Sequence, residues 1–406
     1  MLKTYDVVCV GGGPGGFSAA IAAARMGRKT LLVERNSYLG GMASTGLGLR
    51  MNARVLEPGG SIQRAFIQHM KRRDGWGEPM TFAGQVAYVP VNPELVKLVM
   101  LQMCEEAGVE LLFSCVPIAA EVAQGRLKQA TFYGKGTSVC IGADIFVDAT
   151  GDGDLADLAG AQSVSGRAQP AMLLFSVCNV DVERLRACVQ SDPGGDGVRE
   201  VCEGRCFEGF ERLLAQARKN ASAPLAARFM RCFCSAEKGR MIIAASCAPD
   251  TDATDPRSRS AGVESASLQA LELYLAMRKG FPGFENCRLS GVSQLLGVRE
   301  SRCFLCRARA GIVSPEESSV ARFAAKAGPD AVYGVPLGAL LTRDLEGLVL
   351  SGRCIATAPE ASHTVRSMSA CMVIGEAAGV YAALSSPRRQ DPVSADEVYA
   401  ALCHMR

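Results

Sequence analysis

Three glycines near the start of the chain have the spacing that a dinucleotide-binding turn requires. Gly11, Gly13 and Gly16 follow an apolar stretch, residues 5–10, and an alanine-rich stretch comes next. In such a strand–turn–helix unit, the first glycine permits the tight turn and the second lets the main chain approach a pyrophosphate. The third lets the helix pack closely on the strand. Free N–H groups at the start of the helix favour the negative charge of the phosphates.

An acidic residue strengthens this signal. Residues 29–33 form a second short apolar strand, which ends at Glu34. This position is close to the offset of about 20 residues at which a carboxylate accepts a hydrogen bond from a ribose hydroxyl. A glycine spacing alone is weak evidence. The strand before it, the helix after it and the acid beyond it together indicate a dinucleotide site.

Three segments that lie far apart in the chain share this strand–turn–helix character. The first covers residues 4–46. The second, 88–154, combines a helix, a buried strand and a small antiparallel meander over 117–141. The third, 336–384, carries a strand, a glycine turn at Gly352 and a long helix of small residues. Because each segment is incomplete alone, we expect all three to build one sheet.

The predicted fold class is α/β. We expect a Rossmann-like, three-layer domain with a parallel sheet and a small antiparallel meander, together with an interposed α+β substrate domain. The nucleotide-binding domain is discontinuous and covers residues 1–50, 85–160 and 336–390. The interposed substrate or cap region covers residues 160–335, together with 50–85. Residues 391–406 form a C-terminal helix.

Local signals place three further features. Ser394 and Glu397 have the spacing of a capping box at the start of the C-terminal helix. The pattern of the interposed region predicts a helix over residues 262–279. The run Gly194–Gly197 predicts a loop.

The composition argues against several classes of protein. Charged residues are 21% of the chain, hydrophobic residues are 48% and the net charge is +3, so a large core is expected and no basic stripe indicates nucleic acid. The most apolar stretch, residues 371–384, is too short to span a membrane and contains Glu376. A strand that begins by Thr4 leaves no room for a signal peptide, so we expect a cytoplasmic location. The 17 cysteines are then expected to be reduced, and the lone pair Cys303 and Cys306 predicts no metal site.

The motifs resemble those of the FAD-dependent oxidoreductases of the glutathione-reductase-like superfamily, and in particular the FAD_oxidored family. The turn Gly11–Gly16 with Glu34 and Arg35 matches the family's first flavin motif, and Gly40–Met42 matches its GGM loop. Residues 148–154 resemble its DATGD motif, residues 299–302 its RESR segment, and residues 352–379 its C-terminal flavin block.

This resemblance implies FAD as the cofactor and assigns its contacts. Glu34 would bind the adenosine ribose beside Arg35, and Val116, on a loop, would meet adenine through its main chain. The pyrophosphate and ribityl region would contact Gly11, Gly13, Pro14, Gly15, Gly16, Thr150, Gly151, Asp152, Gly352 and Arg353. The flavin ring would lie against the loop of Gly41, Met42 and Ser44 and face the helix near Gly375.

The resemblance also points to an acid or base. Flavin supplies the redox chemistry, so the protein must hold the substrate and move a proton. Of the three histidines, only His363 falls in the flavin-binding blocks, and it is the candidate acid or base. The family often has two histidines just before this position, where this chain has Pro359 and Ser362, and His363 stands at the place of the family's glycine. A purely structural loop histidine is the alternative.

Three arginines are the other catalytic candidates: Arg299, Arg302 and Arg366. A guanidinium can bind a substrate carboxylate through two hydrogen bonds, or stabilise negative charge on reduced flavin. The alternative is a structural ion pair, for example of Arg299 or Arg302 with Glu300.

The sequence therefore predicts an FAD-dependent dehydrogenase or reductase that transfers a hydride between a small polar organic substrate and flavin. No second glycine motif follows a strand, so we expect an external electron acceptor or donor in place of a dedicated NAD(P) domain. A flavin monooxygenase and a non-catalytic flavin subunit of an electron-transfer complex are the alternatives. A homo-oligomer is left open.

Overall fold

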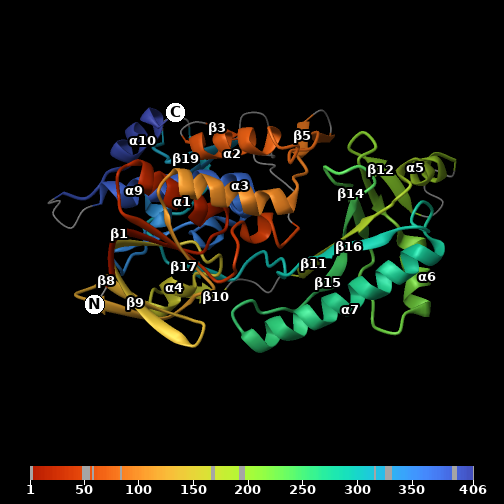
Figure 1. Ribbon diagram of the computed structural model, residues 1–406, viewed down its shortest axis with the longest axis horizontal. Coiled ribbons are helices and arrows are strands. Elements are labelled where there is room, and N and C mark those ends of the chain that lie inside the picture. Colours follow the sequence, from red (N-terminus) through yellow and green to blue (C-terminus); the bar gives the residue numbers. More distant parts are fainter. Residues whose placement is uncertain are drawn as a thin grey trace.

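The computed structural model describes residues 3–47, 55–56, 59–82, 85–165, 170–191, 197–314, 317–324, 332–385 and 391–405. Two lobes lie side by side (Figure 1). One contains both termini and a seven-stranded sheet, and the other contains a six-stranded antiparallel sheet. We call them the nucleotide lobe and the cap lobe.

The sheet of the nucleotide lobe joins strands from all three predicted segments. Its order is β6 (Glu110–Phe113), β2 (Thr30–Glu34), β1 (Lys3–Val10), β9 (Thr137–Asp148), β8 (Arg126–Gly134) and β7 (Val116–Ala123), and β21 (Leu348–Leu350) also pairs with β9. Strand β1 is parallel to both β2 and β9, whereas β7, β8 and the first half of β9 are antiparallel. The predicted α/β class is confirmed. Val116 begins β7 and is not on a loop, which corrects that prediction, because its main chain already pairs with Tyr133.

Helices from opposite ends of the chain pack together over this sheet. They are α1 (Pro14–Arg25) and α9 (Met368–Leu384), with α3 (Pro93–Glu106) beside α1. A methyl group on Gly375 would lie 2.1 Å from the carbonyl oxygen of Gly15, and one on Gly379 would lie 2.2 Å from that of Ala19. Only glycine permits so close an approach, which explains why α9 is rich in small residues.

The acidic residue inside α9 has a structural partner. The Glu376 carboxylate is fully buried and accepts hydrogen bonds from the Gly60 N–H at 2.6 Å and from the Ser61 N–H and hydroxyl. These groups start α2 (Ser61–Lys71), so Glu376 caps that helix from outside. Burial raises the pKa of Glu376 above its ordinary value despite these hydrogen bonds.

No single helix in the part of the chain that the structure describes is long and apolar enough to cross a membrane. A bent pair, α8 (Pro359–Val365) and α9, meets the length and composition test together, at an angle of 91°. Most of α9 is buried among the other elements of the nucleotide lobe.

The cap lobe is built on one antiparallel sheet. Its order is β12 (Val198–Val201), β13 (Cys206–Gly209), β14 (Met230–Cys234), β15 (Met241–Ala248), β11 (Ala171–Cys178) and β16 (Arg288–Val292). One face packs against α7 (Pro256–Gly280), with α5 (Val182–Ser191) and α6 (Glu211–Asn220) nearby. Met172 and Leu174 lie on the other face and line the cavity described below.

Helix α7 starts earlier than the predicted residue 262. Asp255 is its N-cap and accepts hydrogen bonds from the N–H groups of Arg257 and Ser258, and Pro256 occupies the first helical position. This early start adds a turn that carries Arg259. Of the predicted loop Gly194–Gly197, residues 194–196 lie outside the described residues.

The remaining strands and one short helix form smaller sheets and segments beside these two sheets. They are β3 (Val55–Leu56), β4 (Met80–Phe82), β5 (Gln85–Tyr88), α4 (Asp154–Leu158), β10 (Ser163–Ser165), β17 (Arg302–Phe304), β18 (Gly311–Val313), β19 (Ala321–Ala324) and β20 (Val332–Val335). Phe304, Phe323 and Val335, which the sequence assigned to the interposed region, pack into the core of the nucleotide lobe. The predicted capping box is confirmed at the start of α10 (Ala395–His404).

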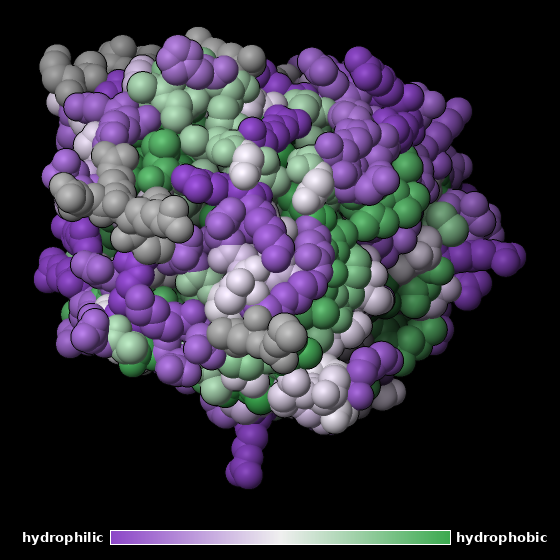
Figure 2. All heavy atoms as spheres, turned by 60° about the vertical axis from the view of Figure 1, so that its left-hand side comes forward, coloured by the Kyte–Doolittle hydropathy of each residue, from purple (hydrophilic) through white to green (hydrophobic). Residues whose placement is uncertain are grey.

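The molecular surface is of mixed character. On the face drawn in Figure 2, hydrophilic residues and patches of hydrophobic residues alternate. The exposed large apolar side chains include Ile118 and Tyr133 on the meander and Leu268, Leu271 and Leu275 on α7.

Candidate active site

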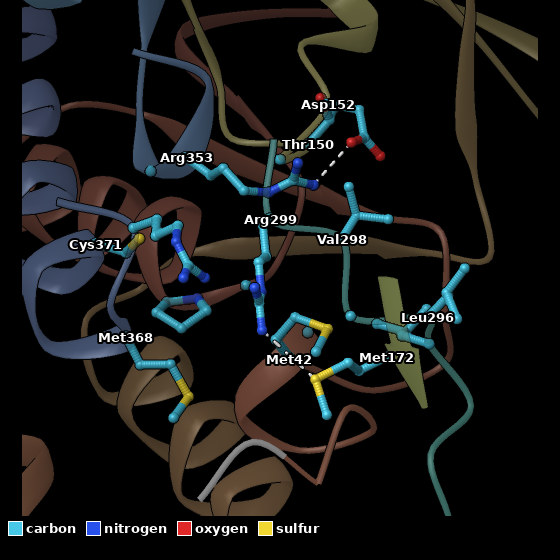
Figure 3. A pocket seen from close by; sticks show the side chains of 18 of the residues that line it. Met42, Thr150, Asp152, Met172, Leu296, Val298, Arg299, Arg353, Met368 and Cys371 are labelled. Atoms are coloured by element: carbon cyan, nitrogen blue, oxygen red, sulfur yellow. Dashed lines mark hydrogen bonds and ion pairs between the residues drawn. The ribbon is translucent and has the colours of Figure 1, made fainter. Parts of the chain in front are cut away.

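A cavity of about 1110 Å³ lies where the two lobes meet. Its lining includes main chain from the glycine turn of the nucleotide lobe and side chains from β11, β14 and β15 of the cap lobe. Figure 3 shows the part around Arg299, where several methionines and arginines face one another. Ligand pockets commonly measure about 300–1,000 Å³, so this one can hold a large ligand.

The glycine turn forms one end of the cavity. Gly11 has a φ of +102°, and a methyl group there would lie 2.4 Å from the carbonyl oxygen of Ala149. Gly13 and Gly15 line the cavity, whereas Gly16 does not. A methyl group on Gly16 would lie 1.9 Å from the Gly11 carbonyl oxygen, so Gly16 acts through helix packing, as its spacing predicts. The first turn of α1 leaves N–H groups directed towards an anion.

Glu34 lies beside this turn at the end of β2. Its side chain is buried, and its two oxygens accept hydrogen bonds from the Gly12 N–H at 2.6 Å and the Asn36 N–H at 2.8 Å. The Asn36 side-chain amide also donates to Oε1, at 2.7 Å, whereas Oε2 accepts only from Gly12 among the bonds described and keeps a lone pair for a ligand hydroxyl. Arg35 and Val116 line the same end of the cavity.

Asp152 joins the two lobes at the middle of the cavity. One carboxylate oxygen accepts a hydrogen bond from Arg353 at 2.7 Å, and the other accepts one from Arg259 of α7, also at 2.7 Å. Burial on its own would raise the pKa of Asp152, but the two guanidinium groups outweigh burial and hold the pKa below its ordinary value. Asp152 is therefore ionised and fixes both arginines.

A buried acid shapes the turn that carries Asp152. Asp148 is fully buried and accepts hydrogen bonds from the N–H and hydroxyl of Thr150 and from the N–H of Ala156. Burial raises the pKa of Asp148. Thr150 and Gly151 are thereby held at the edge of the cavity, which both of them line.

The opposite end of the cavity carries the catalytic candidates. His363 and Arg366, on and just after α8, line it together with Arg299. The imidazole of His363 is exposed. Cys371, on the first turn of α9, lines the same end, but burial raises the pKa of its thiol to about 12, so it remains protonated at neutral pH.

Besides Gly16, three predicted site residues lie outside the cavity lining. Arg302 forms ion pairs with Asp154 at 3.3 Å and Asp157 at 2.9 Å, which is the structural alternative, although with partners other than Glu300. Ser44 is buried and donates its hydroxyl hydrogen bond to the carbonyl of Leu39. Gly375 lies two turns into α9, at the crossing with α1. The N-terminal turn of α9, from Met368 to Cys371, reaches the cavity instead.

Several lining residues were not predicted from the sequence. They include Arg259, Met172, Leu296, Val298 and Met368. The only local signal was the Asp255-Pro256 pair, which marks the true start of α7 and would have placed Arg259 on a helix. The remaining residues reach the cavity through the packing of the two lobes. In the described part of the chain, no group of three or more His, Cys, Asp or Glu residues could hold a metal ion.

Comparison with known proteins decides the family. The model of the FAD-dependent oxidoreductase family matches residues 6–310 and 312–402. The chain belongs to this family. The resemblance on which the sequence prediction rested is confirmed, and FAD is the cofactor.

Matches to individual proteins of this flavoprotein class are shorter. A dihydrolipoyl dehydrogenase from Trypanosoma brucei brucei is 65% identical over 41 residues, which are 10% of this chain and 9% of that protein. A digeranylgeranylglycerophospholipid reductase from Thermoplasma acidophilum is 50% identical over 48 residues, 12% of each chain. The matches thus span only about a tenth of the length of these curated relatives.

Solved structures show the same fold over nearly the whole length of this FAD-dependent oxidoreductase. A geranylgeranyl bacteriochlorophyll reductase-like protein from Thermoplasma acidophilum superposes with a TM-score of 0.52 at 17% identity, over 99% of this chain and 83% of that one. The p-nitrophenol 4-monooxygenase of Pseudomonas putida superposes with a TM-score of 0.51 at 12% identity, over 100% of this chain and 82% of that one. At such identities the likeness concerns the fold.

The cavity suits the family's cofactor. Glu34, Val116, the start of α1 and Asp152, to which the resemblance assigns the adenosine, diphosphate and ribityl chain, line one cavity and could hold FAD. Met42 and Arg299 lie together in the same cavity, at what we call its flavin end (Figure 3). FAD is an extended dinucleotide, so a long cavity with its phosphate site at a helix start is the shape it needs.

Proposed function

We propose that this FAD-dependent oxidoreductase transfers a hydride between a small polar organic substrate and flavin. One observation carries the proposal: a single cavity runs from the glycine turn to His363, Arg299 and Arg366, and the cap lobe walls its far end. A cofactor site and a set of substrate-binding groups thus share one space. When bound, flavin supplies two-electron chemistry.

The protein's own groups have separate tasks in this proposal. His363 takes the proton that a substrate O–H or N–H releases when its C–H hydride leaves, or returns it in the reverse direction. The cap lobe excludes water from the reacting atoms, because its sheet closes the cavity over the substrate. An external electron acceptor or donor completes the cycle.

The first test is to identify the bound flavin and then find a substrate. The purified protein should have a flavin absorption spectrum and should release FAD on denaturation. A substrate should bleach that spectrum without oxygen, and an electron acceptor should restore it. Substrate-dependent consumption of NAD(P)H with hydroxylation of the product would instead identify a monooxygenase. A protein that binds FAD but is bleached by no candidate would match a non-catalytic subunit and contradict the proposal.

The role of His363 has a matched control. His363→Gln keeps a polar side chain but removes the proton acceptor, and we expect the bleaching rate to fall about 10²–10⁴-fold, as for loss of a general base. His404→Gln, on α10 and outside the cavity lining, should bleach at the wild-type rate. Equal rates for all three proteins would show that His363 is a structural residue.

A further inference from the structure

The four residues 299–302 differ sharply in what they contact. Glu300 accepts a hydrogen bond from Ser362, Ser301 accepts one from Arg353, and Arg302 pairs with two aspartates. Arg299 is different: its guanidinium donates to the thioether sulfur of Met172 at 3.6 Å (Figure 3). A thioether is a weak acceptor and carries no charge, so it does not neutralise a guanidinium.

The segment before Arg299 is held by both lobes. The N–H of Gln294 and the hydroxyl of Ser293 donate to the carbonyl of Thr45 in the nucleotide lobe. The main chain of Gly297 exchanges two hydrogen bonds with Met172 on β11, at 2.7 Å and 3.2 Å. Arg299 therefore projects from a backbone that is fixed on both sides, which reduces the entropy lost when it binds a ligand.

The charges along the cavity favour an anion. Seven arginines line it, against three carboxylates. Two of these arginines, Arg259 and Arg353, form ion pairs with Asp152. Arg231 forms one with the buried Glu208, which does not line the cavity. The cofactor's diphosphate belongs at the other end, beside α1, so it does not neutralise Arg299. The guanidinium of Arg299, whose hydrogen bond goes to an uncharged sulfur, thus favours a second anionic ligand at the flavin end.

Apolar side chains form part of the wall around Arg299, beside the polar His363 and Arg366. Met42 comes from the nucleotide lobe and Met172 from the cap lobe, while Leu296, Val298 and Met368 complete the surround (Figure 3). Such walls lower the local dielectric and strengthen an ion pair formed between them. Methionine side chains adapt to ligands of different shapes. The walls therefore suit an apolar body attached to the anion.

We propose that Arg299 binds the carboxylate of the substrate, and that the substrate is an amphipathic monocarboxylic acid whose apolar part lies against Met42, Met172 and Met368. A planar carboxylate matches the fork of a guanidinium and replaces the weak contact to sulfur. The inference deepens the proposed function and rests on it, since it names the substrate class of the same cavity.

The test measures binding of simple probes to the FAD-loaded enzyme. Benzoate, hexanoate and acetate are compared with benzamide and hexanamide, and dissociation constants are read from the change in the flavin spectrum and from calorimetry. We expect benzoate and hexanoate to bind at least about tenfold more tightly than their amides, as one well-formed charge-assisted pair provides. They should also bind at least about tenfold more tightly than acetate, which buries little apolar surface.

Variants locate the effect. Arg299→Met should weaken the binding of benzoate and hexanoate about tenfold or more and leave the binding of the amides unchanged. Arg299→Lys should recover part of the lost affinity. Arg184→Met, an exposed arginine of the cap lobe paired with Glu285, is the matched control and should bind as wild type does. A thermal unfolding curve for each FAD-loaded variant confirms that it is folded.

Failure of this inference can be told apart from failure of the proposed function. Equal binding of carboxylates and amides, or wild-type binding by Arg299→Met, would overturn the carboxylate site even if a neutral substrate bleaches the flavin. If Arg299→Met alters only the flavin spectrum and not probe binding, Arg299 serves the cofactor and the inference is wrong. Arg299-dependent binding of carboxylates in an enzyme that no substrate bleaches would uphold this site and contradict hydride transfer.

Discussion

The two ends of the cavity are built in different ways. At the nucleotide end, main-chain groups of one continuous unit, β1 to β2, make the site, and close packing of glycines holds it. At the substrate end, side chains from many segments of both lobes meet through ion pairs and apolar contacts. The first end comes from one stretch of chain that α9 supports, whereas the second is assembled from distant segments, so they should respond differently to substitution.

Adding a methyl group at the helix crossing should damage the nucleotide end most. In Gly375→Ala the new methyl group would lie 2.1 Å from the Gly15 carbonyl oxygen, and neither main chain can yield easily. We expect the free energy of unfolding to fall by about 3 kcal/mol, the upper end of the usual cost of overpacking, and FAD to be bound more weakly. Gly280→Ala, where a methyl group would meet nothing within 4 Å, is the control. Equal FAD content and unfolding midpoints for both variants would refute this role of the crossing.

Removing the charge of Asp152 should weaken the junction of the lobes. Asp152→Asn leaves Arg259 and Arg353 without their carboxylate. Since both arginines are about a quarter exposed, we expect the free energy of unfolding to fall by about 2 kcal/mol, which is less than the full cost of breaking a buried ion pair. Because the folded pKa of Asp152 is lowered, its contribution is present above its ordinary pKa of 3.8 and is lost as the pH falls through the folded value.

Denaturant unfolding of both proteins across pH 3–7 measures this difference. The difference in unfolding free energy between wild type and Asp152→Asn should be largest at neutral pH and should become smaller in acid. Glu94→Gln, a change at an exposed acid, should show no comparable gap. A gap that stays constant with pH would show that the charge of Asp152 is not its source.

Arg302 and Arg299 give a finer comparison within one segment. The partners of Arg302, Asp154 and Asp157, are nearly half exposed, so Arg302→Met should cost about 1 kcal/mol or less. Binding of benzoate should stay at the wild-type level, whereas Arg299→Met should lose it. Loss of benzoate binding in both variants at equal folded fraction would mean that the whole segment, and not one guanidinium, forms the anion site.

The smallest expected effect concerns Glu376. Its folded pKa is raised by burial, so the folded state favours the protonated form; that stabilisation is present below the ordinary pKa of 4.5 and is lost as the pH rises through the folded value. Glu376→Gln cannot ionise. The stability of wild type relative to this variant should therefore fall as the pH rises from 4.5. Parallel unfolding free energies across that range would contradict the assignment.

This comparison also explains what the sequence could reveal. The turn at Gly11–Gly16, Glu34 and the meander were predicted because their signals are local: glycine spacing, an acid at a fixed offset and alternating strands. Arg302 was assigned a catalytic role because its ion pairs with α4 arise from folding and leave no mark in its own segment. Gly375 likewise has a sequence typical of a cofactor-facing helix, whereas its contact is with Gly15, far away in the chain.

The crossing of α1 and α9 has a consequence for how the protein is made. The glycine turn leaves the ribosome before the helix that packs on it, which follows some 350 residues later, on the order of half a minute at usual rates of synthesis. Residues 171–292 of the cap sheet are complete before that helix exists. The nascent chain therefore carries the segments of the cap sheet and an open nucleotide site, and we expect it to capture its cofactor only once α9 has emerged.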